Sequence, residues 1–211
     1  MRVNHEARAA AAESRRAQTR ARLIEAAISV IVEKGPEASS IEDFVAAAGV
    51  SRGTFYNYFP TFEDQLHALN TQISEDLDET LEPVRSDITD PAVLLATVFH
   101  RIFASFAANP VRAWLAMRID AHGAPRQAVF EARFDGLYRA GVASGRFRPC
   151  DTAAARNLAF GGARMAQREI AMGEAGPDHV SDLTSLLLIA YGLPPEEASS
   201  ISRDAYEAAR S

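Results

Sequence analysis

Residues 41–62 read IEDFVAAAGVSRGTFYNYFPTF, and this stretch predicts two short helices joined by a tight turn. In its first half, apolar side chains recur at the spacing of one helix face, at Ile41, Phe44, Val45 and Ala48. Gly49 follows directly, where a turn between two helices favours a residue without a Cβ atom. The pattern therefore places the end of the first helix at this glycine.

The caps and faces of these helices are also predicted. Ser39 and Glu42 have the spacing of a capping box, and Ser51 is placed to cap a second helix from residue 52 to 59. One face of that second helix carries Phe55 and Phe59, which can pack against the first helix. The other face is too polar and aromatic for an ordinary solvated surface, with Arg52, Thr54, Tyr56, Asn57 and Tyr58. This is the layout of a helix-turn-helix whose second helix is the recognition helix.

The residues GVSRGTFYNYF, followed by PTFEDQL, resemble the TetR family of bacterial transcriptional repressors. The resemblance is densest over Arg20–Leu66, and farther along the chain only the helical architecture is similar. It implies an all-α protein with an N-terminal three-helix helix-turn-helix domain, joined by a linker helix to a C-terminal helical bundle. The implied partners are a palindromic DNA operator, a second copy of the chain and a small-molecule effector.

The resemblance also implies which residues contact DNA. Carried over position by position, they are Ser40, Ser51, Arg52, Thr54, Tyr56, Asn57 and Tyr58. Arg52 is the candidate for a base contact, because a guanidinium group can bond guanine O6 and N7 at once. Tyr56 and Tyr58 are candidates for phosphate contacts, which fix the register of the protein on the duplex. The alternatives are a solvated charge for Arg52 and packing against the first helix for the tyrosines.

One residue departs from the family pattern. Many relatives carry a lysine that contacts phosphate where this chain has Phe62. The sequence therefore predicts a salt dependence of DNA binding that is shallower by about one phosphate contact.

The sequence predicts three parts: a basic arm rich in Ala and Arg at 1–14, the helix-turn-helix domain at 15–62, and a helical body for effector binding and dimerisation at 63–211. The net charge of the chain is −6, but residues 1–22 hold six arginines against two glutamates, a net charge of +4. A basic DNA-contacting end on an acidic body fits this distribution. The arm is expected to be either disordered or an extension of the first helix, which runs from about Ser14 to Lys34.

Helix signals continue through the rest of the chain. A linker helix, capped by Thr61, is expected to run to Pro83. Further helices are expected from near residues 91, 110 and 125, after residues 151 and 178, and from near residue 195. No useful stretch alternates with period two, so the fold class is all-α.

The resemblance assigns dimerisation to the helices that follow residues 151 and 178. The candidate interface residues are Leu158, Gly162, Met165, Leu183 and Leu187. The alternative for these residues is the core of a single chain. Two recognition helices in a dimer can read a palindrome with half-sites about one helical turn apart, or a small multiple of that distance.

The resemblance places the effector cavity among the aromatic residues between positions 99 and 138. The candidates for ligand binding are His100, Phe103, Trp114, Arg118, Phe134, Tyr138 and Arg164. Aromatic side chains with polar groups among them suit an apolar or amphipathic effector. The alternative is that these residues form an ordinary core.

Composition and the absence of certain motifs argue against a membrane protein, a secreted disulfide-rich protein and an enzyme. The hydrophobic content is 47%, no apolar run is expected to reach the roughly 18 residues of a membrane span, and no secretory signal is present. A single cysteine, Cys150, cannot build a disulfide framework, so a cytoplasmic location is expected. The chain has no E-x-x-H motif, G-x-S-x-G elbow or glycine-rich phosphate loop, so we expect no enzyme activity, no cofactor and no metal.

The sequence thus predicts a DNA-binding repressor that a small apolar or amphipathic effector releases from its operator. A regulator or activator controlled by abundance or by a protein partner is the second hypothesis. An all-α enzyme or carrier is the third. The operator, the regulated genes and the effector are not encoded in any recognisable pattern.

Overall fold

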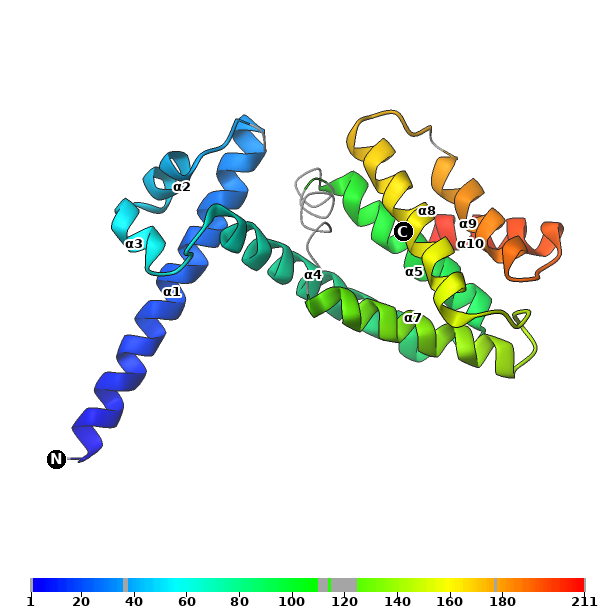
Figure 1. The fold of residues 1–211 in the computed structure, drawn as a ribbon, viewed down its shortest axis with the longest axis horizontal. Helices are drawn as coiled ribbons and strands as arrows, with labels where there is room; N and C mark the ends of the chain where they lie inside the picture. The colour runs from blue at the N-terminus through cyan, green and yellow to red at the C-terminus, as the bar shows by residue number, and fades with distance from the viewer. Residues whose placement is uncertain (1, 36–37, 110–113, 115–124, 177, 211) are drawn as a thin grey trace. The chain divides into compact units, whose positions relative to one another are not determined.

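The fold is that of a computed structural model, which describes residues 2–35, 38–109, 114, 125–176 and 178–210. Over these residues the chain is helical and contains no strand (Figure 1). It divides into two compact units, Met1–Leu69 and Asn70–Ser211. The predicted fold class is confirmed: the chain has an N-terminal helix-turn-helix unit, a linker helix and a C-terminal helical body.

The N-terminal unit contains α1 (Arg2–Lys34), α2 (Ile41–Ala48), α3 (Arg52–Tyr56) and the start of α4 (Phe62–Asp87). The body contains the rest of α4 with α5 (Pro91–Ala108), α7 (Pro125–Ala143), α8 (Thr152–Ala171), α9 (His179–Ala190) and α10 (Pro195–Arg210). The helix expected from near residue 110 lies outside the described residues, apart from residue 114.

The residues of the expected arm extend the first helix, which is the second of the two alternatives that the sequence offers. This helix begins at Arg2 rather than near Ser14, so the residues of the expected arm are helical. Five alanines lie at residues 7–12, and alanine has the highest helix propensity of any residue, which accounts for this extension. The apolar stripe of α1 is buried in the N-terminal unit as Leu23, Ile24, Ala27, Val30 and Ile31.

The cap of α2 lies one residue later than predicted. Ser40, not Ser39, is the N-cap: its hydroxyl accepts from the Asp43 N–H at 3.3 Å, and Asp43 accepts from the Ser40 N–H at 3.1 Å. Ser39 instead donates its hydroxyl to the Gly35 carbonyl at 2.8 Å. The box therefore uses Asp43 at its third position rather than Glu42, which leaves the Glu42 side chain for another partner.

Two helix ends also differ from the prediction. The recognition helix ends at Tyr56 rather than at residue 59, because Pro60 disfavours helical dihedrals at Phe59, which turns into the core. The linker helix continues through Pro83 to Asp87. Proline inside a helix removes one backbone hydrogen bond, but buried neighbours at Leu81 and Val84 hold this part of α4 in place.

The core of the body surrounds α5, which packs against α7, α8, α9 and α10. By length and composition alone α5 could cross a membrane, with a mean hydropathy of 1.5 over 18 residues, so the expectation that no run reaches this length is wrong. A single helix of this kind is weak evidence for a membrane span, because the core helix of a soluble protein has the same length and composition. Its buried residues, which include Leu95, Ala96, Phe99 and Phe103, belong to the core cluster of the body. Core burial therefore explains the apolar sequence of α5.

Candidate nucleic-acid interface and helical body

The turn between α2 and α3 is set by Gly49 and Ser51. Gly49 has φ of 64°, in the left-handed region that glycine adopts without strain, and it ends α2. Ser51 then caps α3, as predicted, by accepting from the Thr54 N–H at 3.0 Å. Phe55 is fully buried, which orients the opposite face of α3 toward solvent.

Arg52 is the main charged group on this outer face. Its side chain is 61% exposed, with Nη1 2.5 Å from Glu42 Oε1 and Nη2 3.4 Å from the Tyr56 hydroxyl. The guanidinium also lies 5.8 Å from the centre of the Tyr56 ring. The hydrogen bond to Tyr56 and the charge of Glu42 raise the pKa of Arg52. The site therefore presents a fully charged guanidinium that a carboxylate holds in the absence of DNA.

The two predicted tyrosines differ in their surroundings. Tyr56 is exposed, with its ring edge-on to Phe55 at 5.4 Å, so its hydroxyl is accessible from solvent. Tyr58 is partly buried, and the Arg16 guanidinium of α1 lies 5.8 Å from its ring centre. Arg20 lies similarly over Phe59 at 5.4 Å. Arginines of α1 thus contact the end of the recognition segment, and for Tyr58 this is the packing against the first helix that the sequence offers as the alternative to a phosphate contact.

The remaining DNA-binding candidates lie at helix ends. The hydroxyls of Ser40 and Ser51 are engaged in their caps, and Thr54 Oγ1 lies 2.9 Å from Ser51 Oγ. Asn57 is exposed and forms the C-cap of α3. These residues offer backbone N–H groups and short polar side chains around Arg52 and Tyr56.

Phe62, the departure from the family pattern, packs inside the N-terminal unit. Its ring stacks on Phe44 with the centres 5.5 Å apart and the planes 10° from parallel. Thr61 caps α4 beside it, accepting from the Asp64 N–H at 3.1 Å. A phenylalanine at this position therefore joins α4 to α2, a contact that a lysine does not make.

The ligand candidates lie at several places in the body. Phe103, Phe134 and Tyr138 are buried in its core, where Tyr138 also packs on Phe147 and Tyr191 at 5.7 and 5.2 Å. Trp114 is partly buried and Arg164 is exposed. Arg118 lies outside the described residues.

His100 is buried at 2% exposure, and its partners come from α10. Its Nε2 lies 3.1 Å from Ser202 Oγ, and the Tyr206 ring lies edge-on at 5.8 Å. Ser202 donates its hydroxyl to the Ser181 carbonyl at 2.8 Å, so Nε2–H of His100 is the donor toward Ser202. Burial lowers the pKa of His100 to about 4, so the imidazole is neutral at neutral pH.

The dimer candidates are divided between the surface and the core. Leu158 and Met165 of α8 are 51% and 50% exposed, whereas Leu187 of α9 is buried in the core. Its neighbour Leu186 is the exposed position, at 63%. Gly162 and Leu183 join α8 to α9, because a Cβ atom on Gly162 would lie 3.1 Å from a Leu183 methyl group.

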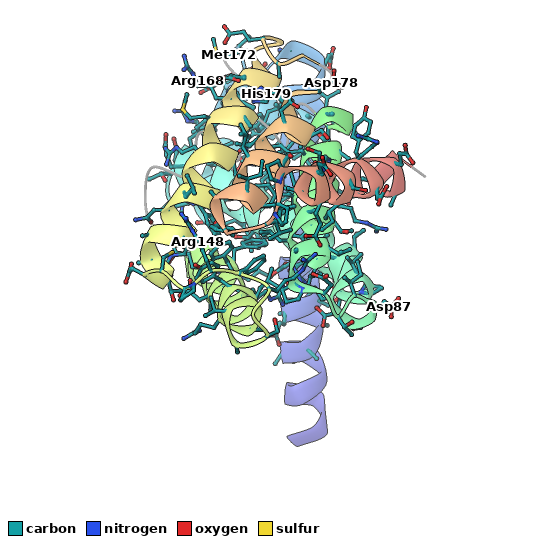
Figure 2. The ribbon with its side chains drawn as sticks, turned by 90° about the vertical axis from the view of Figure 1, so that its right-hand side faces the viewer. Asp87, Arg148, Arg168, Met172, Asp178 and His179 are labelled. Carbon is teal, nitrogen blue, oxygen red and sulfur yellow. The ribbon has the colours of Figure 1, made fainter. Side chains whose placement is uncertain are left out.

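The end of this surface is visible in Figure 2, which labels Arg168 and Met172 of α8 near Asp178 and His179 at the start of α9. His179 Nε2 lies 3.1 Å from Glu169 Oε2, so an ion pair links the two helices there when the imidazole is protonated. Leu158 and Met165 of α8, Met172 at its C-cap and Leu186 of α9 are large apolar side chains that the described chain leaves exposed.

Comparisons with known proteins agree with this geometry. The family model described as bacterial regulatory proteins, tetR family, matches residues 23–69. The fatty acid metabolism regulator protein of Bacillus subtilis (strain 168) is 30% identical over 152 residues, 66% of this chain and 76% of that protein. The HTH-type transcriptional repressor DhaR of Mycobacterium sp. (strain GP1) is 32% identical over 78 residues, 37% of this chain and 39% of that protein.

Solved structures are similar over most of the chain. RolR in complex with resorcinol has a TM-score of 0.68 and 26% identity, covering 90% of this chain and 95% of that one. A TetR-family transcriptional regulator from Pectobacterium atrosepticum has a TM-score of 0.69 and 25% identity, covering 85% and 96% of the two chains. The similarity thus extends through both the N-terminal unit and the body.

Proposed function

Because the chain belongs to the TetR family of bacterial transcriptional regulators, we propose that it is a repressor that binds a palindromic operator as a homodimer. In this proposal a small apolar or amphipathic effector binds the body and releases the DNA. The observation that carries the proposal is the outer face of α3, where Arg52 and Tyr56 are exposed while Phe55 anchors the helix.

The proposed DNA contacts follow from the chemistry of that face. Arg52 exchanges Glu42 for a base edge, where its guanidinium bonds guanine O6 and N7. Tyr56 and Tyr58 donate to phosphates, Thr54 and Asn57 contact the groove wall, and the helix starts at Ser40 and Ser51 bind phosphate. The exposed Arg8 and Arg15 of α1 add sequence-independent attraction to the backbone.

A single recognition helix reads only a few base pairs, so the proposal includes a dimer. The exposed Leu158, Met165 and Leu186 support an interface along α8 and α9, with the half-buried Leu183 at its centre. Apolar groups of this size stabilise an association when a partner removes them from water. Gly161, where an added Cβ would meet no neighbour within 4 Å, leaves room for a helix of the second subunit to approach.

Effector response is proposed because of the relatives. The structure of RolR contains resorcinol, and the relative from Bacillus subtilis is named for fatty acid metabolism, so both concern small molecules with apolar parts. Among the ligand candidates, Phe103, Phe134 and Tyr138 would supply apolar contact, and Trp114, Arg118 and Arg164 polar groups. We further propose a cytoplasmic location and no enzyme activity, since the named relatives are regulators.

The experiment that tests this function is a selection of genomic DNA fragments with the purified chain at low salt. The expected result is one enriched palindromic motif, located near a promoter that the chain represses in a reporter assay. Absence of any enriched motif would contradict the proposal. Enrichment with activation of the reporter would support a DNA-binding activator, and a reporter that no small molecule relieves would support the second hypothesis, an effector-independent regulator controlled by abundance or by a protein partner.

A further inference from the structure

The body contains a cleft of about 520 Å³ between α4, α5 and α10. This volume lies within the range of small-molecule binding sites, roughly 300–1,000 Å³. None of the ligand candidates that the structure describes lines this cleft. The cleft is therefore distinct from the aromatic core in which the sequence places an effector.

The walls of the cleft are mostly apolar. One side is formed by Pro83 and Val84 of α4 with Ile88 directly after it, another by Val93 of α5, and a third by Ala208 of α10. Val84 is buried, while Ile88 and Val93 are partly exposed where they face the cleft. An apolar molecule of suitable size would remove these side chains from water, which is favourable by roughly 25 cal/mol per Å² buried.

Arg101 supplies the one guanidinium group among the described residues that line the cleft. Nε of Arg101 is buried and has no hydrogen-bond partner among the described residues. Because Nε is shielded from solvent, a ligand in the cleft would meet the outer nitrogens of the guanidinium, which donate to an acceptor as a charged group. Arg101 lines the cleft from α5, so such an acceptor would lie beside the apolar wall of α4.

Two carboxylates define the charge of the opening. Asp87 at the end of α4 and Asp204 of α10 line the cleft and are exposed (Asp87 is labelled in Figure 2). Neither carboxylate forms an ion pair with any residue that the structure describes. With one guanidinium against two carboxylates, the lining carries a net negative charge, which disfavours an anionic ligand.

We propose that this cleft binds an uncharged amphipathic molecule, whose polar end carries both an acceptor and a donor. A primary carboxamide has this chemistry: its carbonyl accepts from the Arg101 guanidinium, its NH₂ group donates to Asp87 or Asp204, and its chain lies along Pro83, Val84 and Ile88. A carboxylate of the same length would satisfy Arg101 but would face the two acidic groups.

The position of the cleft connects it to the linker helix. Pro83 cannot donate to the Glu79 carbonyl, so the hydrogen-bond ladder of α4 is interrupted at the wall of the cleft. Bending α4 there costs less than bending an unbroken helix. The same helix begins at Phe62 in the N-terminal unit, so an occupant that moves it would act on DNA binding, a consequence that rests on the proposed function.

The test compares octanamide with octanoate, two nearly isosteric probes that differ in charge. Binding to the full chain is measured by ¹H–¹⁵N chemical-shift changes in a titration. We expect octanamide to shift amides of α4, α5 and α10 in a saturable way and to bind at least fivefold more tightly than octanoate. Tighter binding of octanoate, or shifts confined to the aromatic core around Tyr138, would overturn the proposal.

Two variants and a control locate the site. Ala208→Trp fills the cleft from an exposed position and is expected to abolish octanamide binding, while Arg101→Met removes the donor and weakens binding at least threefold. Ala153→Trp, at an exposed position of α8 outside the lining, is the control and should bind as the wild type does. Unchanged binding in Ala208→Trp would place the probe elsewhere. DNA binding without a probe is measured in parallel, so that failure of the cleft and failure of the repressor proposal are distinguished.

Discussion

At the scale of single residues, Arg52 has two competing partners. In the free protein its guanidinium is held by Glu42 at 2.5 Å, with both side chains mostly exposed. An ion pair of this kind contributes little to stability, typically about 0–1 kcal/mol, because water and salt screen it. In the proposed DNA complex, Arg52 exchanges the Glu42 carboxylate for a base, and the charge of Glu42 repels nearby phosphates.

Glu42→Gln is therefore expected to raise the affinity for random-sequence DNA by about threefold, since it removes one negative charge beside the interface and releases Arg52. The measurement is a fluorescence anisotropy titration with a labelled duplex of scrambled sequence. Glu196→Gln, an exposed acid of α10, is the matched control and should leave the affinity unchanged. Weaker binding by Glu42→Gln would show instead that Glu42 orients Arg52 for DNA.

His100 is expected to make the free energy of unfolding of the body depend on pH. Its pKa of about 4 in the folded chain is lower than the value of about 6.5 in an unfolded one, so the unfolded chain takes up the proton first as pH falls. The free energy of unfolding should decrease from about pH 6.5 down to about pH 4, by about 3 kcal/mol at most, and this contribution should stop changing below pH 4.

The measurement is urea unfolding of the wild type and of His100→Gln between pH 7 and pH 4. Glutamine can still donate to Ser202 but does not titrate, so we expect the wild type to lose more stability than the variant over this range. His67→Gln in the N-terminal unit serves as the matched control. Parallel pH profiles for the wild type and His100→Gln would contradict the burial argument.

At the scale of elements, local patterns predict helices well and their ends less well. The stripe of α1, the cap at Ser51 and the turn at Gly49 are all as the sequence predicts, because each depends on neighbours within about four residues. The predicted cap of α2 is wrong by one residue, since Ser39 and Ser40 are both followed three positions later by an acid. The predicted end of α4 is wrong because packing of Leu81 and Val84 outweighs the effect of Pro83.

Alanine substitutions of Gly49 and Gly53 test the left-handed turn between α2 and α3. Gly49 has φ of 64°, so Gly49→Ala should lower the free energy of unfolding by about 1 kcal/mol or more. Gly53 lies inside α3, and an added methyl group there would meet open space, its nearest neighbour Ser51 Oγ being 3.8 Å away. Gly53→Ala should therefore stabilise the unit by up to about 1 kcal/mol. Thermal unfolding followed by circular dichroism measures both, and equal effects would contradict the left-handed turn.

At the scale of the whole molecule, the features that sequence could not predict are those made by distant residues. The contact of Arg20 with Phe59, the pairing of His100 with Ser202 and the cleft beside Arg101 each join segments far apart in the chain. The predicted dimer residues show the same limit. Helical spacing places Leu158, Met165 and Leu187 on apolar helix faces. It does not show which of these side chains is buried in the core of its own chain and which is left exposed.

Association between subunits is expected to depend on the exposed apolar groups of α8. The double variant Leu158→Glu and Met165→Glu places two charges on this face and should shift the protein from dimer to monomer at micromolar concentration, as measured by sedimentation equilibrium. Val32→Glu, on the exposed side of α1, should remain dimeric. A variant that stays dimeric despite both glutamates would place the interface elsewhere.

Reading of a DNA sequence by the outer face of α3 can be measured in a single titration experiment. The affinity of the wild type, Arg52→Ala and Arg203→Ala is measured on the palindrome enriched from genomic fragments and on a scrambled duplex at the same salt concentration. Arg203 is an exposed arginine of α10 and controls for loss of charge. We predict that Arg52→Ala loses about 1–3 kcal/mol of preference for the palindrome per half-site, while Arg203→Ala keeps it. Equal preference in the wild type and Arg52→Ala would contradict the account.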